Sequence, residues 1–251
     1  MLKSILRPAV IAFSLAAASA AYAAEFNDAQ RKEIGEVVRQ YLLENPELLR
    51  ELGAALEQKE KLAEDAVRKE ALTANADKVF RSDAHFVAGN PKGDVTMVEF
   101  FDYNCGWCKK GLPEVVKLIE ADKNLRFVLV EFPIFGEDSD YAARAALAAK
   151  KQGKYWELHI AMLSHEGKVN AAIVDELAAA NGLDMAKLKA DMADPAIAAL
   201  ISDNQALAQS LAINGTPAFI IDQTVVPGYL PQEGLLAAIQ EVRAGGGCKL
   251  C

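Results

Sequence analysis

Val98-Glu99-Phe100-Phe101-Asp102-Tyr103-Asn104-Cys105-Gly106-Trp107-Cys108 is the stretch that decides the fold of this chain. Its first half continues a β-branched and aromatic run that begins at Val95, a pattern typical of a buried strand. Beyond the cysteines, apolar residues at helical spacing predict a helix in which Pro113 introduces a kink. Cys105 and Cys108 therefore stand where a strand ends and a helix begins.

This position suits the two cysteines to redox chemistry. Cys105 is at the predicted helix N-terminus, where unpaired backbone N–H groups and the helix dipole stabilise a thiolate and lower the thiol pKa. Cys108 lies one turn further in and is shielded. We expect an exposed Cys105 that attacks or is attacked in disulfide exchange, and a Cys108 that resolves the mixed disulfide.

Two other uses of these cysteines remain open. An inert structural disulfide would employ the same residues without turnover. A zinc site would need four ligands, and the only other cysteines, Cys248 and Cys251, lie far away in the sequence.

Cys248 and Cys251 follow three consecutive glycines. We expect residues 245–251 to be flexible and dispensable for exchange at Cys105. The pair could hold a soft cation such as Cu(I), or close a local disulfide after export.

Working outward, the sequence predicts an α/β fold. Further strands are expected at Leu125–Phe132, Ala218–Ile221 and Thr224–Val226, with a hairpin across Asp222-Gln223. The residues between Phe132 and Ala218 show helical periodicity throughout, with caps at Asp184 and Asp194. We predict a main domain at residues 79–244, with a helical subdomain inserted at about 138–211 and a last helix at Gln232–Val242.

The start of the chain carries an export signal. Lys3 and Arg7 precede an apolar run, and Ala21-Tyr22-Ala23 is typical of a signal-peptidase site, so residues 1–23 are expected to be cleaved off after Ala23. Export would place the cysteines in an oxidising compartment.

Residues 24–78 are predicted to form an N-terminal helical segment. Asn27 or Asp28 can cap a first helix, and Asn45-Pro46 starts a second. Leu49, Leu52 and Leu56 form a narrow apolar seam on the second helix. Such a seam fits packing against copies of the chain, and a helix lying on its own domain would show the same pattern.

The charge balance excludes one class of partner. The chain has 27 Lys and Arg against 35 Asp and Glu, a formal net charge of -8. Nucleic-acid binding needs a basic stripe, which is missing, so we expect no nucleic-acid partner. His85, His159 and His165 lack metal-ligand spacing, and we predict no cofactor.

The segment from Val98 to Lys109 resembles the active site of the DsbA-like thioredoxin-fold proteins of the bacterial periplasm. Gly215-Thr216-Pro217-Ala218-Phe219 is similar to the cis-proline loop of that family, and Pro113 matches the kink of its active-site helix. The resemblance covers about residues 80–242 and is strongest to the suppressor-of-copper-sensitivity protein C branch, whose members carry an N-terminal oligomerising segment. It implies a thioredoxin fold, a periplasmic location and a homo-oligomer, with a trimer as one option.

The resemblance also implies roles for individual residues. Cys105 would be the nucleophile and Cys108 the resolving cysteine. Glu99 would be a buried acid that relays the proton of Cys108, unless it reaches solvent at the strand end. Thr216-Pro217 would form a cis peptide that faces the cysteines and binds an extended substrate, with an ordinary trans proline as the alternative. Trp107 would offer an apolar face to substrates or pack on the helical insertion.

The dipeptide between the cysteines bears on the direction of the chemistry. Gly106-Trp107 lacks the His of the strongest oxidases in the family, so we expect weaker thiolate stabilisation and a less oxidising disulfide. The expected function is a thiol-disulfide oxidoreductase that favours isomerisation, acting on unfolded or misoxidised exported proteins together with a membrane thiol-redox partner. A DsbA-type dithiol oxidase is the alternative in the same class. A periplasmic protein that binds copper or another soft metal is the alternative from a different class.

Overall fold

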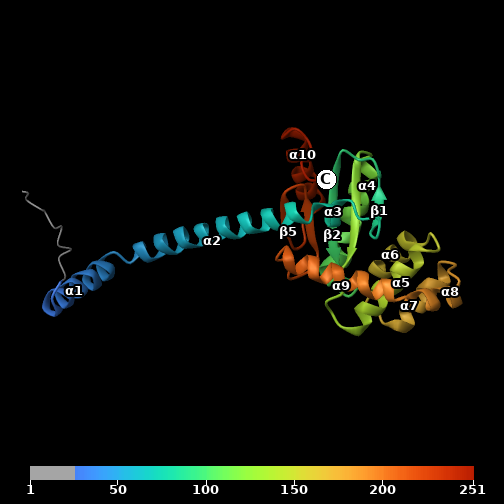
Figure 1. Cartoon of the computed structure of the whole chain (residues 1–251), viewed down its shortest axis with the longest axis horizontal. Coiled ribbons are helices and arrows are strands. Elements are labelled where there is room, and N and C mark those ends of the chain that lie inside the picture. Colours follow the sequence, from blue (N-terminus) through green and yellow to red (C-terminus); the bar gives the residue numbers. More distant parts are fainter. Residues whose placement is uncertain (1–25) are drawn as a thin grey trace, which may run out of the picture. The chain divides into compact units, whose positions relative to one another are not determined.

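The computed structural model describes residues 26–251 of the chain (Figure 1). The signal peptide expected at residues 1–23 lies outside the described residues. The chain divides into two units, of which the first ends at Lys59 and the second spans Glu60–Cys251. Within residues 26–251, no helix is long and apolar enough to cross a membrane.

A mixed five-stranded sheet in the order β1-β3-β2-β4-β5 forms the centre of the second unit (Figure 1). Strands β2 and β3 run parallel, and the other neighbouring strands are antiparallel. The strands are β1 (Phe86–Gly89), β2 (Val95–Phe101), β3 (Leu125–Glu131), β4 (Ala218–Ile221) and β5 (Thr224–Pro227). Strand β1 was not expected from the sequence, because its four residues, which end at a glycine, carry too little pattern to indicate a strand.

Each face of the sheet has its own apolar core. On β2, Met97 and Phe101 belong to one core, and Val98 and Phe100 belong to the other. Because successive side chains of a strand point to opposite faces, Glu99 shares the face of Met97 and Phe101. The tertiary structure therefore directs this carboxyl inward.

Helices cover both faces of the sheet. The first core includes side chains from α4 (Gly106–Ala121), from α10 (Gln232–Ala244) and from most of the insertion. The second includes α3 (Ala76–Phe80) and the last turns of α9. Five helices lie between β3 and β4, where the helical insertion is expected: α5 (Glu137–Lys150), α6 (Tyr155–Ser164), α7 (Ala171–Ala180), α8 (Met185–Met192) and α9 (Pro195–Ser210).

Side-chain caps mark the starts of several helices at positions visible in the sequence. Asp184 accepts a hydrogen bond from the backbone of Lys187 at the start of α8, and Asp194 accepts one from Ala196 at the start of α9. In the first unit, Asn27 forms a reciprocal capping box with Gln30. These short-range bonds satisfy backbone donors that no helix can satisfy internally.

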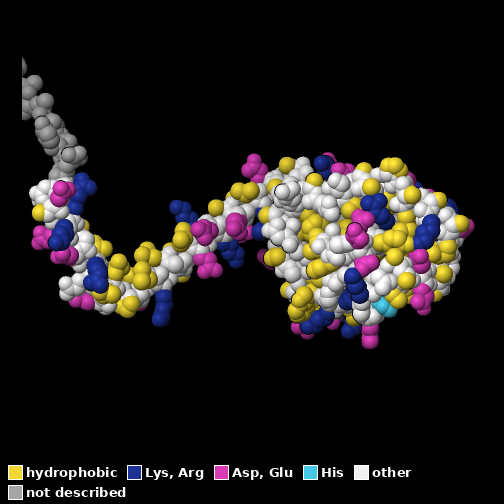
Figure 2. Space-filling model, turned by 90° about the horizontal axis from the view of Figure 1, so that it is seen from below, with side chains coloured by type: hydrophobic (Ala, Val, Ile, Leu, Met, Phe, Trp, Pro, Cys, Tyr) yellow, Lys and Arg dark blue, Asp and Glu magenta, His cyan; other side chains and the backbone are white. Residues whose placement is uncertain are grey.

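The apolar seam of the first unit is exposed to solvent. It contains α1 (Asp28–Glu44) and the beginning of α2 (Glu47–Ala74). Leu49, Leu52 and Leu56 of the seam are 60%, 61% and 57% exposed. Figure 2 shows apolar side chains gathered near the junction of α1 and α2. Monomeric proteins seldom expose a contiguous apolar surface of this kind.

The second unit begins earlier than the boundary at residue 78 that the sequence predicts. Leu72 near the end of α2 is fully buried, as are Val79 and Phe80 of α3. These side chains pack in the core that contains Val98 of β2 and Val128 of β3. The end of the N-terminal helical segment is therefore part of the sheet domain.

Residues 245–251 are held in place, which corrects the expectation of a flexible segment. Asp222, in the turn between β4 and β5, accepts hydrogen bonds from the backbone N–H groups of Lys249 at 2.7 Å and Leu250 at 2.8 Å. Arg81 donates to the carbonyl of Leu250 at 2.6 Å. Cys248 and Cys251 form the local disulfide, one of the two states considered. Long-range hydrogen bonds thus overcome the freedom that the glycines confer.

Candidate active site

The two cysteines of the Cys-x-x-Cys motif lie at the start of α4. Cys105 is the N-cap residue in an extended conformation, and Cys108 belongs to the first turn. Both are free cysteines. Their exposures are only 3% for Cys105 and 1% for Cys108, so the exposed Cys105 expected from sequence is wrong. A loop from a distant part of the chain covers it.

The covering loop contains Thr216 and Pro217, which precede β4. The peptide bond between them is cis, and the trans alternative is wrong. The Sγ atom of Cys105 lies 3.1 Å from the carbonyl oxygen of Thr216, across 111 residues of sequence, and donates a hydrogen bond to it when Cys105 is protonated. The antiparallel pairing of β4 with β2 brings this loop to the helix start.

Hydrogen bonds give the two sulfurs opposite protonation behaviour. The hydrogen bond from the Cys108 thiol is the main cause that lowers the pKa of Cys105 to about 5. The side chain of Thr216 and nearby backbone N–H groups also lower this pKa, whereas burial raises it. Burial and the same hydrogen bond raise the pKa of Cys108. At neutral pH, Cys105 is a thiolate and Cys108 a thiol. Weak thiolate stabilisation was expected without a His, and hydrogen bonds supply that stabilisation instead.

Glu99 is a buried acid on β2, six residues before Cys105. Its exposure is 5%, so the alternative that it reaches solvent is wrong. Burial, and secondarily the negative charge of Cys105, raise the pKa of Glu99 to about 8. The Glu99 charge in turn helps to raise the pKa of Cys108. The carboxyl and both sulfurs therefore form one electrostatic group.

Asp102 anchors the active-site loop and was missed by sequence analysis. Its Oδ1 atom accepts hydrogen bonds from the backbone N–H of Asn104 and the hydroxyl of Ser139, both at 2.7 Å. Its Oδ2 atom accepts from the backbone N–H groups of Ile134 at 2.7 Å and Phe135 at 3.1 Å. One buried carboxylate thus joins the loop before Cys105 to the loop before α5.

Two further side chains tie the helical insertion to the active site. Asn104 donates to the carbonyl of Val169 at 3.1 Å and accepts from its N–H at 2.8 Å. Lys109 donates to the carbonyls of His165 at 2.8 Å and Gly167 at 2.5 Å. The only sequence signal for Asn104 was its place in a polar loop before a helix start, which is common to many loops, and Lys109 lies within α4.

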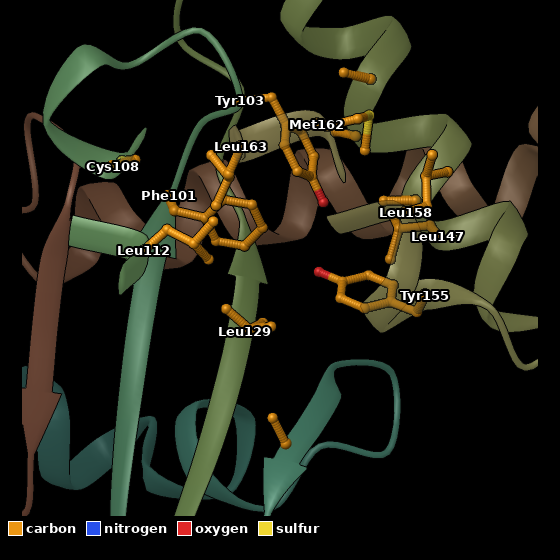
Figure 3. Close-up of a cluster of buried hydrophobic side chains, with 14 of the residues drawn as sticks. Phe101, Tyr103, Cys108, Leu112, Leu129, Leu147, Tyr155, Leu158, Met162 and Leu163 are labelled. Atoms are coloured by element: carbon orange, nitrogen blue, oxygen red, sulfur yellow. The ribbon is translucent and has the colours of Figure 1, made fainter. Parts of the chain in front are cut away.

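A buried polar cluster lies behind the loop (Figure 3). The hydroxyls of Tyr103 and Tyr155 point toward each other, and both donate to Oε1 of Glu131, at 3.0 Å and 2.7 Å. Burial raises the pKa of Glu131 to about 8 and lowers that of His159 to about 3. His159 lies 3.2 Å from the Tyr103 hydroxyl, so it is a satisfied core histidine as expected. The cluster fixes Tyr103, two residues before Cys105.

Trp107 stands at the surface beside the cysteines. It is 54% exposed, and its ring centroid lies 5.5 Å from that of Tyr229. The Nζ atom of Lys110 lies 4.7 Å from the ring centroid of Trp107 and 5.0 Å from that of Tyr229. Trp107 therefore packs beside Tyr229, not on the helical insertion as the alternative had it. Ile134 and Phe135, which the Asp102 carboxylate holds, are also exposed apolar residues.

The structure keeps the second cysteine pair apart from this site. The Sγ atom of Cys251 lies 3.3 Å from the backbone nitrogen of Thr96 at the start of β2, whereas Cys105 follows the end of that strand. A single zinc ion cannot take ligands from both ends of a strand. The alternative of a four-cysteine zinc site is therefore wrong.

Comparisons with known proteins agree with this geometry. Residues 96–240 match the DSBA-like thioredoxin domain family, and residues 30–63 match the copper resistance protein ScsC N-terminal domain. A thioredoxin-like oxidoreductase from Silicibacter pomeroyi is 47% identical and superposes with a TM-score of 0.66, over 67% of this chain and 97% of that protein. ScsC from Proteus mirabilis, in a transitional conformation, is 27% identical with a TM-score of 0.65, over 88% and 98% of the two chains.

One curated relative embeds the same domain in a larger protein. The Na(+)/H(+) antiporter NhaA 1 of Salinispora arenicola is 31% identical over 165 residues, which is 65% of this chain. This chain spans about a quarter of the length of that relative, as the match covers 25% of it.

Proposed function

We propose that this chain, which belongs to the DSBA-like thioredoxin family and is a thiol-disulfide oxidoreductase, works as a disulfide isomerase on exported proteins. The observation that carries the proposal is the Cys105 thiolate, hydrogen-bonded by the Cys108 thiol beside a cis-proline loop. An isomerase needs a thiolate that is ready to attack a wrong disulfide. Its clients are unfolded or misoxidised proteins of the periplasm, and a membrane thiol-redox protein keeps the pair reduced.

The first step forms a mixed disulfide. The Cys105 thiolate attacks one sulfur of the client disulfide, and the other client sulfur leaves as a thiolate. The backbone at Thr216 and Pro217 holds the client segment as an added strand, which aligns its sulfur with Cys105. Trp107 and Phe135 supply an apolar rim for unfolded chains. The freed client thiolate can then attack a different client disulfide. The client thiolate released there attacks the mixed disulfide, which forms the new client disulfide and returns Cys105 as a thiolate.

The second step releases a client that stays bound. Cys108 must lose its proton before it can attack Cys105, and Glu99 is the base. In the mixed disulfide Cys105 carries no charge, so one of the two causes that raise the pKa of Glu99 disappears. Glu99 therefore becomes a more available base at the stage that requires one.

Glu99→Gln is expected to slow this release step by about 100-fold, because an amide cannot accept the proton. In the parent protein, the release rate should rise with pH and level off at or below about 8, since the carboxyl must be ionised to act. Decay of a preformed mixed disulfide with a fluorescent peptide measures the rate. Glu131→Gln, a matched change at a buried carboxyl on β3, should keep the pH profile. An unchanged profile in Glu99→Gln would remove Glu99 from the mechanism.

The N-terminal seam is expected to assemble the chain into a homo-oligomer, with a trimer as one option. The match of residues 30–63 to the ScsC N-terminal domain and the exposed leucines support this. Leu52→Asp puts a charge into the seam and should reduce the mass to that of a monomer, because a buried unpaired carboxylate is costly. Leu43→Asp changes an equally exposed leucine outside the seam and should leave the mass unchanged. Light scattering tests both, and a monomeric parent protein would refute the assembly.

The test of isomerase function compares two ribonuclease substrates. The whole chain should reactivate scrambled ribonuclease faster than it oxidises reduced ribonuclease. Removal of residues 26–59 should lower the isomerase rate more than the oxidase rate, because several thiolates around one client raise their effective concentration. The deletion ends at Lys59, since Leu72 and the following helix belong to the domain core. Efficient oxidation of reduced ribonuclease without reactivation of scrambled ribonuclease would disprove the isomerase function.

A dithiol oxidase is the second candidate, and one observation favours it. The low pKa of Cys105, about 5, stabilises the reduced pair and thereby makes the disulfide more oxidising. Equilibration of Cys105 and Cys108 with glutathione buffers separates the candidates. An isomerase pair should be mostly reduced at the redox potential of the periplasm, and an oxidase pair mostly disulfide.

A further inference from the structure

Cys248 and Cys251 form a second cysteine site in the domain. Figure 1 marks this end of the chain beside the sheet. Cys251 contacts Thr96 at the start of β2, and the strand runs on to Phe101 before Cys105 is reached. That stretch of strand extends over about 17 Å. The two cysteine pairs therefore cannot exchange disulfides within one folded domain.

A buried carboxylate completes this second site. One ligand atom each from Asp222, Cys248 and Cys251 lie within 4.8 Å of one another. In the part of the chain that the structure describes, this is the one group of three potential metal ligands so arranged. Asp222 is 7% exposed and both cysteines are half-buried.

The site is held together by contacts other than the disulfide. Asp222 accepts hydrogen bonds from the backbone N–H groups of Lys249 and Leu250, and Arg81 donates a hydrogen bond to the carbonyl oxygen of Leu250. The side chains of Leu250 and Cys251 pack against the second core. None of these contacts uses the sulfur–sulfur bond, so we expect the two thiols to stay beside the carboxylate when the disulfide is opened.

We propose that Cys248 and Cys251 form a redox-gated site for one Cu(I) ion bound by their two sulfurs, beside the carboxylate of Asp222. The disulfide offers no thiolate and keeps the site closed. An external dithiol opens it: the Cys248–Cys251 bond takes up two electrons and two protons, and the dithiol becomes a disulfide. Cu(I) then binds both sulfurs and displaces their two protons into solvent.

The donor set favours copper over zinc. Thiolates select Cu(I) and zinc among the biological metals. Structural zinc is almost always four-coordinate, whereas Cu(I) is satisfied by two or three soft ligands. The site offers two sulfurs and the carboxylate of Asp222, which already accepts two backbone hydrogen bonds. A hollow of about 310 Å³ is bordered by Asp222 and Lys249.

The test uses the whole chain with Cys105→Ser and Cys108→Ser, so that only the second pair can bind copper. The reduced protein is titrated with Cu(I) under anaerobic conditions against the chelator bathocuproine disulfonate. It should retain one Cu(I) per chain, and the same protein with the disulfide closed should retain none. Adding Cys248→Ser and Cys251→Ser should abolish retention. Asp222→Asn keeps an oxygen that can accept the hydrogen bonds of Lys249 and Leu250. It should lower the affinity for Cu(I) by about tenfold or more.

Several outcomes would overturn the proposal. Absence of copper retention by reduced protein whose circular dichroism and melting are those of the parent would refute the site. Retention of Zn²⁺ in place of Cu(I) would refute the choice of ion. Retention that survives the loss of Cys248 and Cys251 would place the copper elsewhere. Because the active-site cysteines are absent from the titrated protein, none of these results bears on the proposed isomerase.

Discussion

Cys105→Ala is expected to abolish disulfide exchange, whereas Cys108→Ala should accumulate mixed disulfides with client proteins. The Cys105 sulfur is the one that hydrogen bonds hold as a thiolate, with a pKa of about 5. Its removal should lower insulin reduction by about 10³-fold or more, to the uncatalysed level. Loss of Cys108 removes the group that releases a trapped client, so the covalent complex should persist.

Non-reducing electrophoresis with mass spectrometry measures the trapping. The replacement of Cys248 and Cys251 by alanine is the matched control, because it removes the other Cys-x-x-Cys of the chain. That variant should exchange disulfides at a rate within about twofold of the parent, since its sulfurs lie at the opposite end of β2. Equal trapping by Cys105→Ala and Cys108→Ala would contradict the assignment of the nucleophile.

Asp102→Ala is expected to lower the free energy of unfolding by about 3–5 kcal/mol. The carboxylate accepts four hydrogen bonds in a position that is 1% exposed. Its removal takes the acceptor away from the part-buried N–H groups of Asn104, Ile134 and Phe135, and each lost charge-assisted hydrogen bond is costly. Urea unfolding of the whole chain measures the loss.

Two further variants sharpen this test. Asp102→Asn keeps one acceptor oxygen but turns its amide donors toward backbone donors, so it should lose about half as much stability as the alanine variant. Asp203→Ala, at an exposed position of α9, should change stability by less than about 0.5 kcal/mol. If Asp102→Ala were as mild as Asp203→Ala, the carboxylate would not be the anchor of the active-site loop.

Local signals in the sequence were sufficient to predict most helices and strands and to place the Cys-x-x-Cys motif. The Cys-x-x-Cys at a strand–helix junction, the caps at Asn27 and Asp184, and the strand runs at β2 and β3 each depend on residues close together in the chain. Hydrophobic period and capping chemistry act within one or two turns, so they can be read without knowing what lies opposite. The same holds for the preference of residues 27–74 for helix.

The tertiary structure decided which distant groups meet at the site. Strand pairing places Thr216 on Cys105, and packing of α6 against the sheet brings the Tyr155 hydroxyl to Glu131. Hydrogen bonds to Asp222 fix a segment whose glycines alone indicate freedom. The physical reason is that burial and hydrogen bonding depend on partners far away in the sequence, and these set the pKa values that the chemistry uses. The strand–helix junction already indicated Cys105 as the thiolate, and the tertiary structure added the Thr216 loop and the buried Glu99 beside it.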